Sequence, residues 1–256
     1  MAPGTDHSAA EATLQAAIDK LGTEIRRIDP AYDGLIANIN ECLRTAAYVS
    51  PFGVMLFSDK VQDRVDRLNA QLRQVAEEIG RILDSSAPIL SLIRRSRGWV
   101  EDVLPKLSGA VAIARDVRPN GLHAWGGEAG DAYREKRWGQ EKALQGTTNV
   151  VKETGQWLVD VAALNTAFLV DVTQPVIELI ESIIEAAIEI ATVFGILEAI
   201  DTVADAVASA LTAILEILKR ATQHMVDSMS SLTEARIIYN NNDVFPGGSW
   251  PQAVNR

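Results

Sequence analysis

The stretch 61–82, VQDRVDRLNAQLRQVAEEIGRI, repeats an apolar residue at alternating steps of three and four positions. The repeat positions all carry aliphatic side chains: Val61, Val65, Leu68, Leu72, Val75, Ile79 and Ile82. Because a helix turns once in about 3.6 residues, this spacing places all of them on one narrow stripe, which a partner helix must cover. The stretch therefore predicts long paired helices.

Shorter stripes of the same kind precede this stretch. The first consists of Leu14, Ile18, Leu21, Ile25 and Ile28, and the second of Leu35, Ile39 and Leu43. Pro30 lies between them, and a proline inside a helix removes one hydrogen bond and clashes with the preceding turn. We therefore expect Pro30 to interrupt the helix and Ser-Pro-Phe-Gly at 50–53 to close it.

The chain that follows is predicted to form helices separated by several breaks. Asp84 ahead of Pro88 is typical of a helix start, so a restart is expected there. The apolar stripe then includes Ile89, Ile93, Val100 and Val103. A kink is expected near Pro105. Arg-Pro-Asn-Gly at 118–121 predicts a tight reversal, because Asn and Gly tolerate positive φ.

Two helical stretches follow the reversal. Residues 128–172 are expected to form one long helix that ends before Pro175. Residues 175–218 are apolar over most of the helix circumference, apart from a stripe of glutamates, and predict one buried helix or two that meet near Gly195. The longest uncharged run in that segment, 206–215, is shorter than the roughly 18 residues of a membrane-spanning helix.

The predicted fold class is therefore all-α, an elongated bundle of long antiparallel helices with coiled-coil-like seams. We expect four consecutive segments along the chain. These are an N-terminal helical pair (1–84), a helical hairpin (85–172), apolar C-terminal helices (173–243) and a flexible tail (244–256).

Charge and cysteine content narrow the functional classes. The net charge is −10, from 34 acidic and 24 basic side chains, and this charge repels a phosphate backbone. Nucleic-acid binding is therefore disfavoured, and the basic cluster Arg94, Arg95 and Arg97 is interpreted as solvated surface. Cys42 is the one cysteine, which excludes an intrachain disulfide. The polar start at 1–7 does not resemble a Sec signal peptide.

Residue patterns for catalysis are weak. The three histidines, His7, His123 and His224, have no metal-type spacing, and the chain has no Gly-x-Ser-x-Gly or phosphate-binding loop. The glutamates on 175–218 are more simply a solvated stripe than an acid/base pair, because such a pair needs a cleft. We therefore expect no enzyme activity, no cofactor and no metal.

The segment 123–134, HAWGGEAGDAYR, carries the first motif. Gly126 and Gly127 permit a tight turn, and the Trp125 ring is expected to be buried over the end of a hairpin. Small side chains at Ala129 and Ala132, ahead of Tyr133, are expected to let two helices approach closely.

The second motif is Tyr239-Asn-Asn-Asn-Asp243, at the end of the last helical stretch. A Tyr and an Asp four positions apart share one helix face if the last turn forms, and asparagines weaken that turn. An exposed terminus of this kind is readable by a receptor.

Together the two motifs resemble the WXG family of type VII secretion. Trp125 and Gly127 match its Trp-x-Gly turn; Ala129, Ala132 and Tyr133 match the helix that follows; Tyr239 and Asp243 match its Tyr-x-x-x-Asp/Glu export signal. The resemblance covers mainly 85–172 and 239–243. It implies a secreted, non-enzymatic effector or partner protein that folds in the cytoplasm and binds a helical protein, as a homo- or heterodimer, and the secretion machinery. It leaves open whether Trp125 and Tyr239 meet within one chain.

Two alternatives come from other classes. One is an α-helical pore former that inserts 175–218 into a membrane. The other is a cytosolic coiled-coil scaffold.

Overall fold

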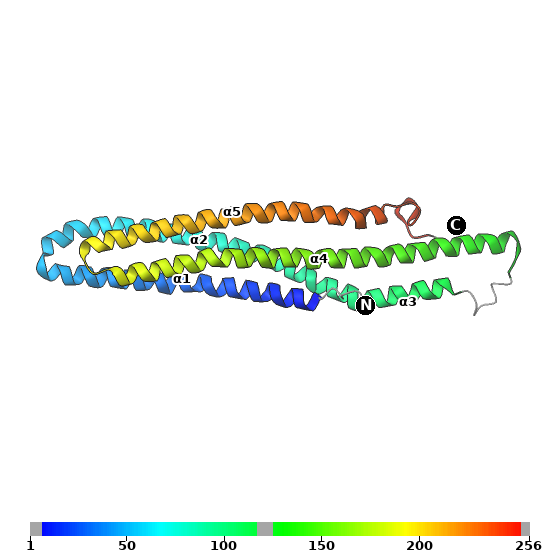
Figure 1. The fold of residues 1–256 in the computed structure, drawn as a ribbon, viewed down its shortest axis with the longest axis horizontal. Helices are drawn as coiled ribbons and strands as arrows, with labels where there is room; N and C mark the ends of the chain where they lie inside the picture. Colours follow the sequence, from blue (N-terminus) through cyan, green and yellow to red (C-terminus); the bar gives the residue numbers. More distant parts are fainter. Residues whose placement is uncertain (1–6, 117–124, 252–256) are drawn as a thin grey trace. The chain divides into compact units, whose positions relative to one another are not determined.

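The computed structural model describes residues 7–116 and 125–251. All regular structure in these two ranges is helical, as the sequence predicts (Figure 1). The long helices are α1 (His7–Val49), α2 (Pro51–Gly98), α3 (Leu104–Arg115), α4 (Gly127–Glu189) and α5 (Val193–Tyr239). The all-α helical bundle is therefore confirmed.

Three prolines lie inside helices that were expected to break there. Pro30 is within α1, Pro88 within α2 and Pro175 within α4. The predicted interruption at Pro30, the restart at 84–88 and the helix end before Pro175 are therefore wrong. An internal proline costs about 3 kcal/mol, and the buried aliphatic side chains on both sides of each proline offset that cost.

Two predicted turns are confirmed. The first separates α1 from α2 at Ser50, directly before Pro51. The second separates α4 from α5 at residues 190–192, close to Gly195. There the Gly195 N–H donates a hydrogen bond to the Thr192 hydroxyl (3.1 Å), so that Thr192 caps α5.

The described helices form two compact units, and each long helix other than α3 contributes to both. Unit 1 comprises 1–12, 89–163 and 224–256, and unit 2 comprises 13–88 and 164–223. Both units combine segments that are distant in the sequence. Neither therefore coincides with the four consecutive segments expected from it.

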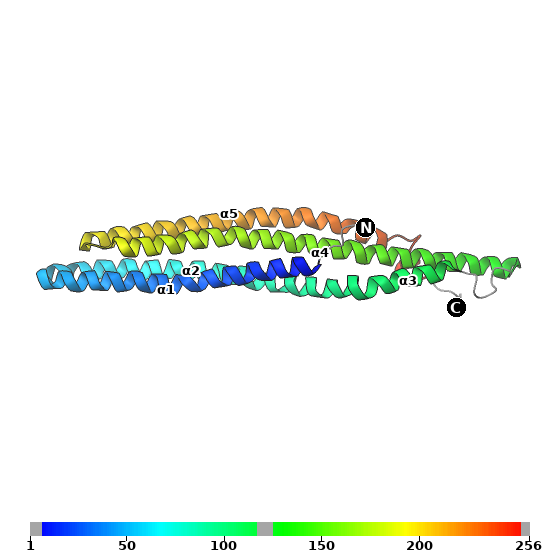
Figure 2. The same cartoon turned by 60° about the horizontal axis from the view of Figure 1, so that its bottom comes forward.

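Unit 2 is a four-helix arrangement of two hairpins, α1 with α2 and α4 with α5 (Figures 1 and 2). Polar contacts fix neighbouring helices: Tyr32 donates to the Val65 carbonyl (3.3 Å) and Asn38 to the Ala187 carbonyl (2.7 Å). The heptad stripe of α2 is buried at Val61, Leu68, Leu72, Val75, Ile79 and Ile82, as its spacing predicts. α1 adds the buried residues Leu14, Leu21, Ile28, Leu35 and Ile39. The opposite hairpin contributes, among others, Leu169, Val172, Leu179, Ile180, Ile183, Ile196, Ile200, Val203 and Val207.

Unit 1 contains an irregular helix directly before Pro105. Residues Trp99–Val103 form a π-helical turn, η1, in which the Leu104 N–H donates to the Trp99 carbonyl. The backbone therefore accommodates one extra residue in this turn, where the sequence predicts a kink. Val103, which the predicted stripe included, is exposed as a result.

We expect the core of unit 2 to respond differently to substitutions at neighbouring positions of α4. Ile183 is fully buried and Ile184 is 41% exposed. Ile183→Ala should lower the free energy of unfolding by about 2–5 kcal/mol, because it leaves a cavity. Ile184→Ala should lower it by no more than about 1 kcal/mol. Chemical denaturation followed by circular dichroism measures both, and equal effects would contradict this core assignment.

Candidate functional site

The described part of the first motif lies at the start of α4. Trp125 and Gly126 precede the helix, and Gly127 opens it with φ of +80°. L side chains rarely adopt this conformation, so a glycine is required at position 127. The reversal predicted at 118–121 lies outside the described residues, as does His123 of the motif.

The Trp125 ring is exposed, so the prediction that it is buried over a hairpin end is wrong. It contacts the ring of Tyr133 in the second turn of α4, and the two ring centroids are 5.7 Å apart. The guanidinium of Arg134 donates to the Trp125 carbonyl (2.9 Å) and also pairs with Asp131. These contacts hold the turn against the first two turns of α4 and leave an aromatic pair facing solvent.

The close approach predicted at Ala129 and Ala132 is also wrong, because both side chains are exposed. The buried small residue is Gly130, which the motif did not single out. A Cβ atom there would lie 2.5 Å from the Trp125 carbonyl oxygen. Gly130 therefore lets the turn fold back onto the helix, and only the three-residue spacing from Gly127 could have pointed to it.

The second motif lies where the sequence places it, at the end of α5, but its geometry differs. Tyr239 is the last residue of α5, and Asp243 lies beyond the helix. The Asp243 N–H donates to the side-chain oxygen of Asn241 (2.9 Å). Asparagine side chains compete with helical hydrogen bonds in this way, so the two motif residues do not share a helix face. Both are exposed.

The segment that follows is packed against α4. Phe245 is only 8% exposed and lies beside Gly146, where a Cβ would come 2.5 Å from Val244. Further on, Gln140 donates to the Pro251 carbonyl (3.5 Å). Phe245 is therefore an apolar anchor within the segment predicted to be a flexible tail, because Gly146 leaves room for it, whereas 246–250 are exposed. Residues 252–256 lie outside the described part.

This anchor supports the Tyr239 side chain. The Tyr239 ring lies 5.9 Å from the ring of Phe245, which is itself held in the Gly146 notch. Tyr239 is thus presented on a supported surface and is not part of a frayed helix end.

The two motifs belong to one unit but do not meet within it. The Trp157 indole N–H donates to the Ser228 carbonyl (3.0 Å), which sets α4 and α5 side by side. The tail reaches α4 at Gly146, on the order of 28 Å along the helix from Gly127. Trp125 and Tyr239 therefore do not meet within one chain and belong to separate surfaces of unit 1.

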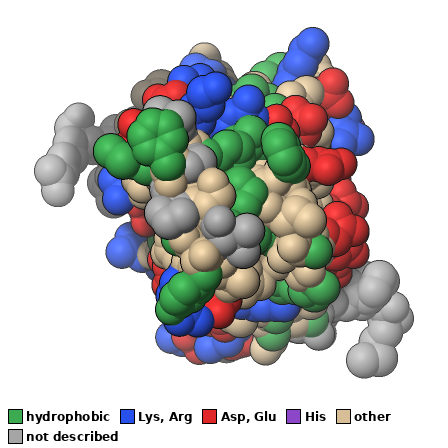
Figure 3. Space-filling model, turned by 90° about the vertical axis from the view of Figure 1, so that its left-hand side faces the viewer, with side chains coloured by type: hydrophobic (Ala, Val, Ile, Leu, Met, Phe, Trp, Pro, Cys, Tyr) green, Lys and Arg blue, Asp and Glu red, His purple; other side chains and the backbone are tan. Residues whose placement is uncertain are grey.

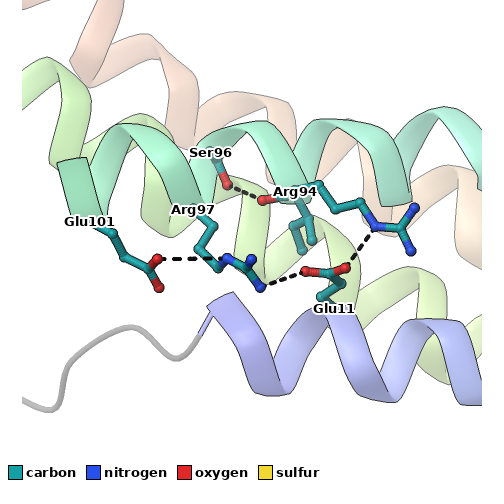
Figure 4. A network of polar contacts seen from close by, with 6 residues as sticks. Glu11, Arg94, Ser96, Arg97 and Glu101 are labelled. Carbon is teal, nitrogen blue, oxygen red and sulfur yellow. Dashed lines mark hydrogen bonds and ion pairs between the residues drawn. The ribbon is translucent and has the colours of Figure 1, made fainter. Parts of the chain in front are cut away.

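The basic cluster of α2 takes part in a clamp within unit 1 (Figure 4). Glu11 accepts from Arg94 (2.7 Å) and from Arg97 (3.1 Å), and Arg97 also lies 3.7 Å from Glu101. These partly exposed pairs contribute little individually. Two of the three arginines of this cluster are thus paired with Glu11 at the start of α1.

A hollow of about 530 Å³ in unit 2 is lined by Asn38, Cys42 and Thr192, with Glu41 at its side. No group of three His, Cys, Asp or Glu in the described ranges is placed to hold a metal ion. Over the same ranges, no helix combines the length and the apolar character that crossing a bilayer requires.

We expect Gly146→Ala to release the tail. The new methyl group would overlap Val244, a stiff β-branched side chain, while alanine favours the helix itself. Amide hydrogen exchange across 244–251 should accelerate by at least about tenfold. Gly139→Ala is the matched control, because a Cβ there meets Pro251 only at an ordinary 3.8 Å. Unchanged protection in Gly146→Ala would show that the notch does not hold the tail.

Comparisons of the chain with protein-family models, with curated proteins and with solved structures found no match.

Proposed function

We propose that this chain is a non-enzymatic substrate of a type VII (WXG-type) secretion system, exported without a Sec signal peptide, that acts by binding a helical partner protein. The observation that carries the proposal is the exposed Tyr239 at the end of the last long helix, with an exposed Asp243 four residues later. This is the spacing of the export signal that the sequence resembles.

The supported geometry of Tyr239 favours recognition by a receptor. A side chain held by Phe245 has already lost much of its conformational freedom, so binding it costs less entropy than binding a frayed end. The Asn241 side chain accepts from the backbone N–H of Asp243 and so holds the main chain at that position.

The Trp125 turn supports a second contact, with a helical partner. Trp125 and Tyr133 are exposed as a pair, and Trp138, five residues beyond Tyr133 on α4, is also exposed. Aromatic side chains of this kind are enriched at the centres of protein interfaces. Because the export signal lies at a distance, one chain can engage a partner and the exporter at the same time.

The burial of 175–218 disfavours the pore-forming alternative. It requires the apolar residues of 175–218 to leave the protein, yet Leu179, Ile183, Ile196 and Val203 lie in the core of unit 2. Inserting them into a bilayer would require that core to be dismantled.

The export signal can be tested in a host that encodes the secretion system. Tyr239→Ala and Asp243→Ala should each reduce the protein in culture filtrate by at least about tenfold, with the protein retained in the cells, if each loses a contact worth about 1.4 kcal/mol.

Ile237→Ala is the matched control, because Ile237 is an exposed residue on the same last turns of α5. It should be exported as the parent chain is. Undiminished export of both signal variants, with intact helical content, would contradict the proposal.

The Trp125 turn can be tested separately. Gly130→Ala should displace the Trp125 carbonyl and lower affinity for the helical partner by about tenfold or more, because the aromatic pair moves. Gly126→Ala should leave affinity unchanged, since nothing lies within 4 Å of the new methyl group. Pull-down with the co-exported partner and tryptophan fluorescence measure both effects. Equal affinity of the two variants for the partner would show that the Trp125 turn does not take part in partner binding.

A further inference from the structure

A groove runs along unit 2 between α1 and α4. Its first part is a hollow of about 480 Å³, lined among others by Pro30, Gly34 and Ala37 of α1 and by Ile180, Ile184 and Ile188 of α4. It joins the hollow beside Cys42, because Asn38, Ala187 and Ile188 line both. From Arg27 to Ala46 the groove follows α1 for on the order of 28 Å, or about five helical turns. We call the two joined hollows the α1–α4 groove.

The walls of the groove are apolar, and its floor is fixed. Ile184 is 41% exposed and Ile188 is 76% exposed, so both offer apolar surface to a partner. On the opposite wall, nothing lies within 4 Å of a Cβ atom built at Gly34, which leaves room for a helix backbone to approach. The Asn38 amide donates to the Ala187 carbonyl (2.7 Å) and ties the two walls together. The groove therefore exists in the folded chain before any partner binds.

The α4 wall is bordered by acidic side chains alone. Four exposed glutamates follow α4 at helical spacing: Glu178, Glu181, Glu185 and Glu189. Each of the two exposed isoleucines follows one of these glutamates by three residues, which makes them neighbours on the helix surface. The stretch 153–218, which supplies this wall, contains no Lys, Arg or His. Figure 3 looks along unit 2 from the end of its hairpin turns and shows acidic side chains gathered along one edge.

Basic groups of the described ranges leave these glutamates unneutralised. Among the acidic side chains of 164–218, only Asp201 forms an ion pair with a described residue, Arg64 of α2. The last turn of α4 also lacks a basic residue, although the carbonyl groups at a helix C-terminus favour cations. Glutamates four residues apart on a helix repel one another. This arrangement destabilises the free helix, and a cationic partner would relieve it.

The α1 wall carries almost balanced charge. Between 19 and 44 it has five acidic residues, Asp19, Glu24, Asp29, Asp33 and Glu41, and four basic residues, Lys20, Arg26, Arg27 and Arg44. Two of the arginines form ion pairs within α1, Arg27 with Glu24 and Arg44 with Glu41. The α1 wall therefore does not offset the glutamates of α4, and the groove as a whole is acidic.

We propose that the α1–α4 groove binds an amphipathic helix of a partner protein, one with an apolar stripe flanked by Lys and Arg. The stripe of that helix packs against Ile184, Ile188 and the small side chains of α1, and its basic residues pair with Glu181 and Glu185. Docking of this kind adds a fifth helix to the four of unit 2. The groove belongs to unit 2, whereas both sequence motifs belong to unit 1, so this inference does not rest on the proposed function.

Charge and shape disfavour other occupants. The glutamates repel phosphate groups, both in nucleic acids and in anionic lipid headgroups. An extended peptide strand needs a sheet edge, and all regular structure in the described ranges is helical. A two-fold dimer through this face would set one concave groove against another and leave both unfilled.

Fluorescence anisotropy of a labelled peptide tests the charge selectivity. The probe is a synthetic amphipathic helix of about 18 Leu and Lys residues, which matches the length of the groove. The full chain should bind it, more weakly at high salt, and should not bind a peptide with Glu in place of Lys. The double variant Glu181→Gln, Glu185→Gln should weaken binding at least about tenfold. The matched control is Glu198→Gln, Asp205→Asn, which removes the same charge from exposed side chains of α5 and should bind as the parent chain does.

The groove itself is tested with Gly34→Trp. The new ring would occupy the space that the bound helix needs without a clash at its Cβ atom, so affinity for the peptide should fall at least about tenfold. Gly80→Trp is the matched control, because Gly80 of α2 has equally open space and does not line the groove. Circular dichroism of each variant checks that the helices remain.

Four results would overturn the proposal. The first is no binding of the Leu/Lys peptide by the parent chain, and the second is an equal loss of affinity in the two charge variants. The third is full affinity of Gly34→Trp for the peptide. The fourth is sedimentation that shows self-association of the parent chain and its loss in Gly34→Trp, because a second copy would then fill the groove.

Discussion

Burial of aliphatic stripes between helices is the interaction on which this structure depends. In unit 2 the α2 stripe from Val61 to Ile82 faces the stripes of the neighbouring helices, and burial continues past Pro30 in α1 and Pro175 in α4. A proline destabilises one turn of a helix, whereas burial of an apolar stripe stabilises every turn that it covers. Continuous burial therefore decides where these helices end. Within the described ranges, the breaks between the paired long helices lie at Ser50 and at 190–192.

The strength of each sequence signal explains what could be predicted. The helical class and the α2 stripe follow from periodicity, which averages over many residues and tolerates local exceptions. The proline breaks were mispredicted because a local rule was applied where tertiary packing outweighs it. The compact units were not predictable at all, because they join segments such as 89–163 and 224–256 through contacts that no local pattern encodes.

The candidate sites show the same limit at single residues. The sequence located Trp125, Gly127, Tyr239 and Asp243 at helix ends, since glycine and asparagine mark such ends. The sequence did not predict burial correctly: Trp125 is exposed, and Phe245 of the tail is buried. The glycines that make room, Gly130 and Gly146, have no signature of their own, because their role appears only when another segment lies against them.

The π-helical turn Trp99–Val103 changes which residues lie on each face of the helix that follows it. One extra residue in a turn rotates every later side chain by about 100° around the axis. The face that α3 turns toward α4 is therefore set by the length of this segment as well as by its composition. Loss of a single residue there would leave the hydrophobic content of α3 unchanged and yet direct it elsewhere, so that Arg115 would no longer reach Glu141.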